Sequence, residues 1–187
     1  MPAAPLLLLL ALALAGCEAR DAAAPPTSAA PKTPADTSGP PPSAAAAAAE
    51  IEPVGRSGVR GTVTATQVEG GVRVAARLDG LSETGFHAFQ VLASDDCDDP
   101  RHLGDSAGAP HGGPYGPPGF RHAGDLGNVR GDDGEGRYDR IDPVLALDGP
   151  LSAVGRAVVV RALPDDASSP DGAAGDVIGC GVLQPAP

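Results

Sequence analysis

Four residues in one stretch of the chain have the types and spacing of a metal site. The stretch reads RHLGDSAGAPHGGPYGPPGFRHAGDLGN and contains His102, His111, His122 and Asp125. Three imidazoles and one carboxylate complete the tetrahedral shell that zinc prefers and leave no open position, which is typical of a structural site. The alternative is a set of surface histidines in a Gly/Pro-rich loop. Because a loop so poor in apolar residues needs something to order it, we favour zinc.

Alternation of apolar and polar residues predicts β-strands around this loop. "VRGTVTATQVE" begins at Val59, and "VRVAARL" follows the turn Gly70-Gly71, so the two segments predict a hairpin. No segment shows a helical period. The part from 51 to 187 is therefore expected to be an all-β sandwich or barrel with long connections. Further strands are expected at 85–93, 137–141, 144–148, 154–162 and 177–183.

The first fifty residues differ in composition from the rest. Residues 1–17 have an apolar Leu/Ala core and end in Leu-Ala-Gly-Cys, which resembles the lipobox of bacterial lipoproteins. This predicts a signal peptide and a lipid anchor on Cys17, and Glu18 then favours the outer membrane. The alternative is a plain cleaved signal with an incidental cysteine. Residues 18–50 are Ala, Pro, Ser and Thr almost throughout, which predicts a flexible tether.

Charge and cysteine content narrow the class of protein. A formal net charge of -11, with no basic cluster, argues against nucleic acid as a partner. The expected partner is a membrane, through the lipid on Cys17, with the domain on the periplasmic side of the envelope. In such a compartment Cys97 and Cys180 are expected to pair, the alternative being two buried thiols. The sequence leaves open whether the chain is a monomer or a homodimer.

Several of these motifs together resemble the copper/zinc superoxide dismutases, in their exported bacterial form. The resemblance covers roughly Val59 to Leu183 and rests on Gly85-Phe86-His87, "HGGP" at 111–114, "HAGDLGN" at 122–128, "VGR" at 154–156 and "GCGV" at 179–182. It implies an eight-stranded Greek-key β-barrel with a Cys97–Cys180 disulfide. It also implies zinc on His102, His111, His122 and Asp125. Asp165 matches a carboxylate that links a copper ligand to a zinc ligand in that family, the alternative being a solvated turn residue.

The copper half of the resemblance is incomplete. His87 matches the first copper ligand, and His102 matches the imidazole shared with zinc. Phe89 stands where the second histidine of the H-x-H pair belongs, and Arg161 stands where the last copper ligand belongs. Val177 takes the place of the arginine that guides superoxide. Since strand side chains alternate, His87 and Phe89 are expected to share one face.

The preferred hypothesis is a zinc-binding envelope lipoprotein that has lost copper-dependent dismutation and has no assigned catalytic residue. One alternative is an active superoxide dismutase whose altered copper site uses His87, His102 and a further group. A weaker alternative is a copper carrier, for which the chain offers no methionine beyond the initiator.

Overall fold

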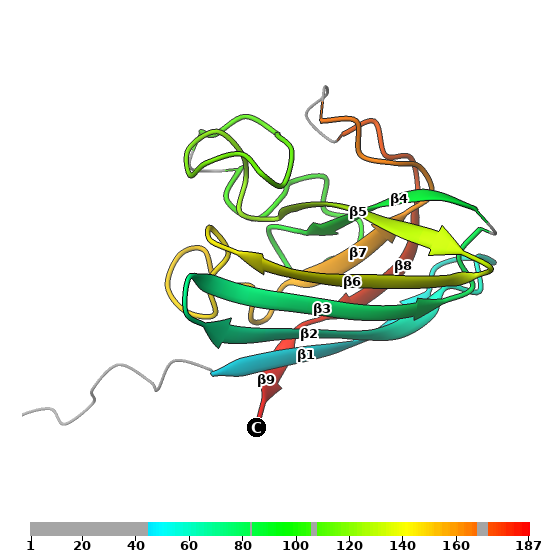
Figure 1. Cartoon of the computed structure of the whole chain (residues 1–187), viewed down its shortest axis with the longest axis horizontal. Helices are drawn as coiled ribbons and strands as arrows, with labels where there is room; N and C mark the ends of the chain where they lie inside the picture. Colours follow the sequence, from blue (N-terminus) through cyan, green and yellow to red (C-terminus); the bar gives the residue numbers. More distant parts are fainter. Residues whose placement is uncertain (1–44, 83, 106–107, 168–171) are drawn as a thin grey trace, which may run out of the picture. The chain divides into compact units, whose positions relative to one another are not determined.

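The computed structural model describes residues 45–82, 84–105, 108–167 and 172–187. The predicted signal peptide, Cys17, Glu18 and most of the tether lie outside these residues. No helix among the described residues is long and apolar enough to span a membrane. The strands of the described part are β1 (Ala46–Pro53), β2 (Arg60–Val68), β3 (Gly71–Asp79), β4 (Thr84–Val91), β5 (Asp125–Asp132), β6 (Glu135–Asp142), β7 (Ala157–Arg161), β8 (Val177–Val182) and β9 (Gln184–Ala186) (Figure 1).

Eight of these strands close into an antiparallel barrel. The order around it is β1-β2-β3-β6-β5-β4-β7-β8, and β8 pairs with β1 again. The short β9 adds to β1. The order around the barrel differs from the order in the sequence, since β4 pairs with β7 as well as with β5. This pairing brings the connection after β4 close to the connection after β7. The all-β fold class expected from the alternating pattern is confirmed.

Three local expectations differ from the structure. Residues 125–132, where the pattern predicted no strand, form β5. Residues 46–50, which composition assigned to the tether, form the first half of β1, with Ala47 and Ala49 buried and the backbone paired to β2. A run of alanines gives no strand signal, so this strand depends on its neighbours. The segment 144–148 is not a strand, because the Asp142 carboxylate accepts the backbone N–H groups of Val144 and Leu145 and holds a turn there.

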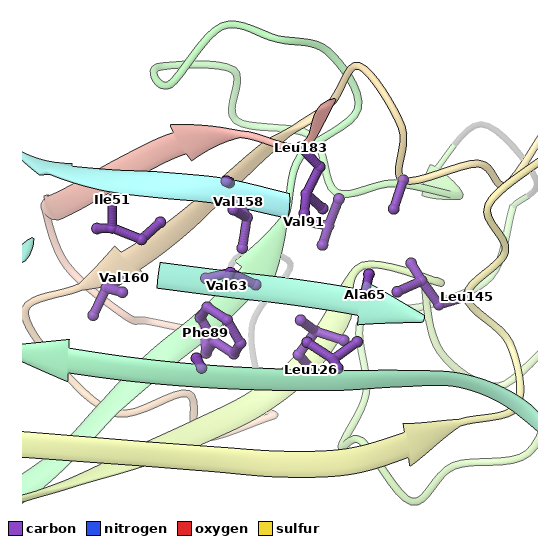
Figure 2. Packing of buried hydrophobic residues seen from close by; sticks show 14 of the residues in the cluster. Ile51, Val63, Ala65, Phe89, Val91, Leu126, Leu145, Val158, Val160 and Leu183 are labelled. Atoms are coloured by element: carbon purple, nitrogen blue, oxygen red, sulfur yellow. The ribbon is translucent and has the colours of Figure 1, made fainter. Parts of the chain in front are cut away.

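The interior of the barrel is filled mainly by Val, Leu and Ala, as the low aromatic content requires. Phe89 is fully buried there and meets Tyr138 edge to face, with ring centroids 5.0 Å apart. Figure 2 shows Phe89 inside the barrel among Val63, Val160 and other core side chains. Phe89 is therefore a core residue.

A disulfide joins Cys97, in the connection after β4, to Cys180 on β8, which confirms the expected pairing. The bond closes 83 residues of sequence. A loop of that length corresponds to a stabilisation of about 4 kcal/mol on the chain-entropy model. The disulfide fixes the start of the long connection between β4 and β5 to the barrel wall.

Two long connections lie on the same side of the barrel (Figure 1). One joins β4 to β5 and carries the predicted metal ligands, and the other joins β7 to β8 and carries Asp165. A hydrogen bond from His111 to Asp165 links them. Together they form the layer in which the candidate site lies.

Candidate metal centre

The structure brings His102, His111, His122 and Asp125 together. One potential ligand atom from each residue lies within 4.8 Å of all the others. His102, His122 and Asp125 are buried, and the side chain of His111 is only 2% exposed. Among the described residues this is the one group of three or more such side chains that could hold a metal ion.

The two oxygens of Asp125 have different roles. Oδ1 lies 2.7 Å from His102 Nδ1, 3.0 Å from His111 Nδ1 and 3.3 Å from His122 Nδ1. Oδ2 accepts the backbone N–H groups of Gly112, at 3.0 Å, and His122, at 2.8 Å. The backbone therefore fixes the carboxylate while three imidazoles present the same ring nitrogen to one oxygen.

Each ligand is positioned by a different local device. Asp125 is the first residue of β5, so its backbone is set by the barrel. His102 forms an isolated antiparallel bridge with Leu92, just beyond the end of β4. Gly127, with a φ of 83°, brings the start of β5 close to Pro114, where any Cβ would lie 2.5 Å from the proline ring. The close approach keeps the loop that carries His111 against the strand that carries Asp125.

Arg121 anchors the ligand loop to the barrel. Its guanidinium is buried and donates to both oxygens of Asp142 at the end of β6, at 2.5 and 2.7 Å. It also donates to the backbone carbonyls of His122 and Asp125. A buried charge of this kind is tolerated only when it is paired and fully hydrogen-bonded. The sequence reasoning missed Arg121, although a lone arginine directly before a ligand histidine was a usable signal.

Asp165 contacts this cluster from the other connection. Its Oδ1 accepts from His111 Nε2 at 2.9 Å, and Asn128 binds both its backbone N–H and its backbone carbonyl. A proton held on Nε2 by a carboxylate leaves Nδ1 free to bind a metal. Asp165 Oδ2 is buried without a hydrogen-bond partner among the described residues, and the hydrogen bonds found there do not link Asp165 to His87.

The electrostatics of the cluster follow from these contacts. Burial alone would lower the pKa of His111, but its hydrogen bonds to Asp125 and Asp165 outweigh burial and raise the pKa to about 9. Burial opposes ionisation of Asp125, yet hydrogen bonds from His102 and His111 hold the pKa of that carboxyl well below its usual range. The site without metal thus binds a proton between two carboxylates, where a cation is electrostatically favoured.

The donor set fits a metal ion. His111 Nε2 donates to Asp165, so a neutral His111 has no proton on Nδ1 to donate to Asp125, and His122 Nδ1 is buried without a hydrogen-bond partner among the described residues. A cation at the centre would satisfy all four groups. Three nitrogens and one oxygen are the number and kind of donors that closed tetrahedral metal sites use.

His87 lies away from this cluster. Its Nε2 is 2.7 Å from Ser82 Oγ and its Nδ1 is 3.0 Å from the backbone oxygen of Arg161. In the register of the sheet it lies opposite Val129, a core residue, and Phe89 lies opposite Val160, another core residue. Residues opposite one another project to the same side, so His87 and Phe89 share the interior-facing side of β4, as alternation predicts. Ser82 gave no signal in the sequence.

Arg161 and Val177, at two further positions of the expected copper site, make other contacts. Arg161 Nε donates to Gln90 Oε1 at 2.7 Å, and its Nη1 donates to the backbone oxygen of Gly175 at 3.0 Å. Val177 lies on β8 opposite Arg161. It packs against a second apolar cluster, separate from the barrel core, that consists of Leu92, Ala157, Val159 and Cys180. Gln90 was missed at the sequence level, although an amide inside the apolar run of β4 was a visible anomaly.

A closed eight-stranded barrel with three histidines and one aspartate in its β4–β5 connection defines a recognisable class of metalloprotein. The family model of copper/zinc superoxide dismutase (SODC) matches residues 59–183. The chain is 39% identical over 141 residues to "Superoxide dismutase [Cu-Zn] 2" of Brassica juncea, which covers 67% of this chain and 90% of that protein. The chain belongs to the copper/zinc superoxide dismutase family.

The solved structures agree on the fold. The crystal structure of the clock protein EA4 superimposes with a TM-score of 0.67 and 31% sequence identity, over 77% of this chain and 96% of that one. The family implies zinc and copper, and of the two ligand sets only the His/Asp cluster is assembled among the described residues.

Proposed function

We propose that the protein is a zinc-binding member of this family that lacks copper-dependent dismutation and acts as a structural or binding module in the bacterial envelope. The observation that carries this proposal is the contrast between a complete ligand cluster and the absence, among the described residues, of a second one. Membership of the family is shown, while the identity of the metal and the loss of activity are what we propose.

Zinc is supported by the chemistry of the ligands. The cluster supplies three imidazoles and one carboxylate, which zinc takes in closed structural sites. Asp165 accepts a hydrogen bond from the His111 ring and Asn128 fixes the backbone of Asp165, as partners outside the ligand shell do in such centres. When bound, zinc would neutralise the cluster and tie the β4–β5 connection to β5.

The loss of copper is supported by a count and by the contacts of one residue. The chain has four histidines, and three of them are in the cluster. The fourth, His87, has both ring nitrogens engaged by Ser82 and by the backbone of Arg161. A site that cycles copper between two oxidation states needs several imidazoles on the same ion, and these contacts do not provide them.

An envelope location is supported by two features. The sequence ends its apolar leader in a lipobox with Cys17, and the described domain holds a Cys97–Cys180 disulfide, which is typical of oxidising compartments. We propose that a lipid on Cys17 attaches the chain to the outer membrane, following the Glu18 rule, with the domain facing the periplasm.

The rival function is dismutation, which the name of the Brassica juncea relative favours. The test is a superoxide-removal assay on the full chain, first loaded with zinc and then offered copper. We expect the rate after copper to equal the rate of the zinc-only sample. A copper-dependent rate that His87→Ala abolishes would overturn the proposal and establish an active enzyme.

A further inference from the structure

We infer that the hydrogen-bonded pair Gln90 and Arg161, rather than Phe89, occupies the place from which copper would reach His102, and that this pair excludes the metal. The inference rests on the proposed function and names the residues responsible for it. It differs from the sequence pattern, which points to Phe89 because of its place after His87.

The first step is the orientation of His102. Its Nδ1 faces Asp125 at 2.7 Å, so its Nε2 faces away from the cluster. Nε2 is buried and has no hydrogen-bond partner among the described residues. An imidazole that serves two metals binds one through each nitrogen, and therefore the Nε2 side of His102 is the side on which a second ion would lie.

The second step is the position of Gln90. In the sheet it lies opposite Asp125 on β5 and opposite Val159 on β7. Val159 belongs to the second apolar cluster and not to the barrel core, so Gln90 projects to the side of β4 that faces away from the core. Gln90 thus stands between Asp125, which holds His102, and Arg161, to which it is hydrogen-bonded.

The residues that the family pattern suggests as copper ligands on β4 do not face His102. Phe89 and His87 lie opposite core residues, so both face the interior side of β4. A histidine at position 89 would enter the apolar core beside Tyr138 and would not face His102. A register shift between Ala88 and Gln90 in the pairing with β5 accompanies this arrangement.

The fourth step is the chemistry of the pair. A guanidinium has no lone pair to offer a metal and keeps its positive charge at every accessible pH. The Gln90 amide oxygen, the only ligand atom of that side chain, already accepts from Arg161. The pair therefore offers no ligand atom to a metal. The guanidinium also places a positive charge near an incoming cation, and its hydrogen bond to Gln90 links β4 to β7 where a metal would otherwise do so.

The test compares two double variants in the zinc-loaded full chain. Gln90→His with Arg161→His would give the Nε2 side of His102 two further outward imidazoles, and we expect uptake of about one copper per chain with the visible absorption of Cu(II) bound by nitrogen. Phe89→His with Arg161→His follows the family pattern, and we expect no copper uptake from it. Arg161→His alone is the matched control for the loss of charge.

The outcomes separate this inference from the proposed function. If the Gln90/Arg161 variant keeps its zinc and its fold, judged by circular dichroism, but takes up no copper, the inference is overturned. Uptake of copper by the Phe89/Arg161 variant in addition to its zinc would overturn it as well. Uptake of copper by the unmodified chain in addition to its zinc would instead contradict the proposed function, whatever the variants do.

Discussion

The two ring nitrogens of His102 face two different environments. On the Nδ1 side, His111, His122 and Asp125 converge, and all of these come from one connection and the first residue of the strand after it. On the Nε2 side, any further ligands must come from β4 and β7, and these strands present Gln90 and Arg161 instead. A site carried by one contiguous segment survives changes elsewhere, whereas a site assembled from two strands is lost when two side chains change.

The largest effect is expected from Arg121→Met, which releases the ligand loop from the barrel. This would leave the buried carboxylate of Asp142 without its partner, at a cost of about 3–5 kcal/mol in the free energy of unfolding. Urea unfolding of the zinc-loaded chain measures it. The matched control is Arg73→Met, which removes an exposed pair with Asp139 and should leave the free energy of unfolding almost unchanged, because solvent screens such pairs. Equal losses in both variants would show that Arg121 is not a buried anchor.

The second prediction concerns pH and the metal-free chain. His111 has a folded-state pKa of about 9, above its ordinary value of about 6.5, so its protonation stabilises the fold fully below pH 6.5 and this contribution is lost as the pH rises through 9. The loss should be at most about 3.5 kcal/mol, because the pKa rises by about 2.5 and each unit corresponds to about 1.4 kcal/mol.

Unfolding at pH 6 and pH 9.5, with and without zinc, is the measurement. The zinc-loaded chain should lack this decline, since the metal replaces the proton on Nδ1. If the stability of the metal-free chain instead rose between pH 6 and pH 9.5, His111 would not hold a proton between the carboxylates of Asp125 and Asp165.

The third prediction tests the partner behind His111. Asp165→Asn removes the carboxylate that accepts from Nε2, and loss of such a partner weakens metal affinity by about 10–100-fold. Competition with a zinc chelator measures the affinity, and Asp148→Asn, at an exposed carboxylate, is the control. An unchanged affinity would mean that Asp165 supports the loop without orienting the ligand.

The smallest effect is expected at His87. Ser82→Ala removes the hydrogen bond to Nε2 and should cost about 1 kcal/mol of stability, with zinc affinity unchanged. The two readouts separate a structural histidine from a metal ligand. A change in zinc affinity as large as that of Asp165→Asn would place His87 in the metal centre.

The His/Asp cluster could be predicted because its ligand types lie within one short stretch of sequence and because Asp125 follows His122 closely. The disulfide could be predicted because only two cysteines remain after Cys17, and the all-β fold class because β2 and β3 alternate clearly. These features are local, or depend on counting residue types.

The other half could not be predicted in the same way. The side of the strand that Gln90 occupies depends on the pairing of β4 with β5, including a register shift that leaves no mark on the residue types. The partners of His87 are Ser82 and a backbone oxygen, and a backbone acceptor has no sequence signature. Strand β1 begins within an alanine run, where pairing with β2 decides the structure and composition does not.

The most direct test of the account is the total metal content of the full chain after loading with zinc, incubation with excess copper and removal of loosely bound ions. Copper can replace zinc in a nitrogen-rich site, so the sum of the two metals is the informative quantity. If the chain has a single metal site, we expect about one ion per chain in total, held by the His/Asp cluster. Two ions per chain, one zinc and one copper, would contradict it and would show that the Nε2 side of His102 still binds a metal.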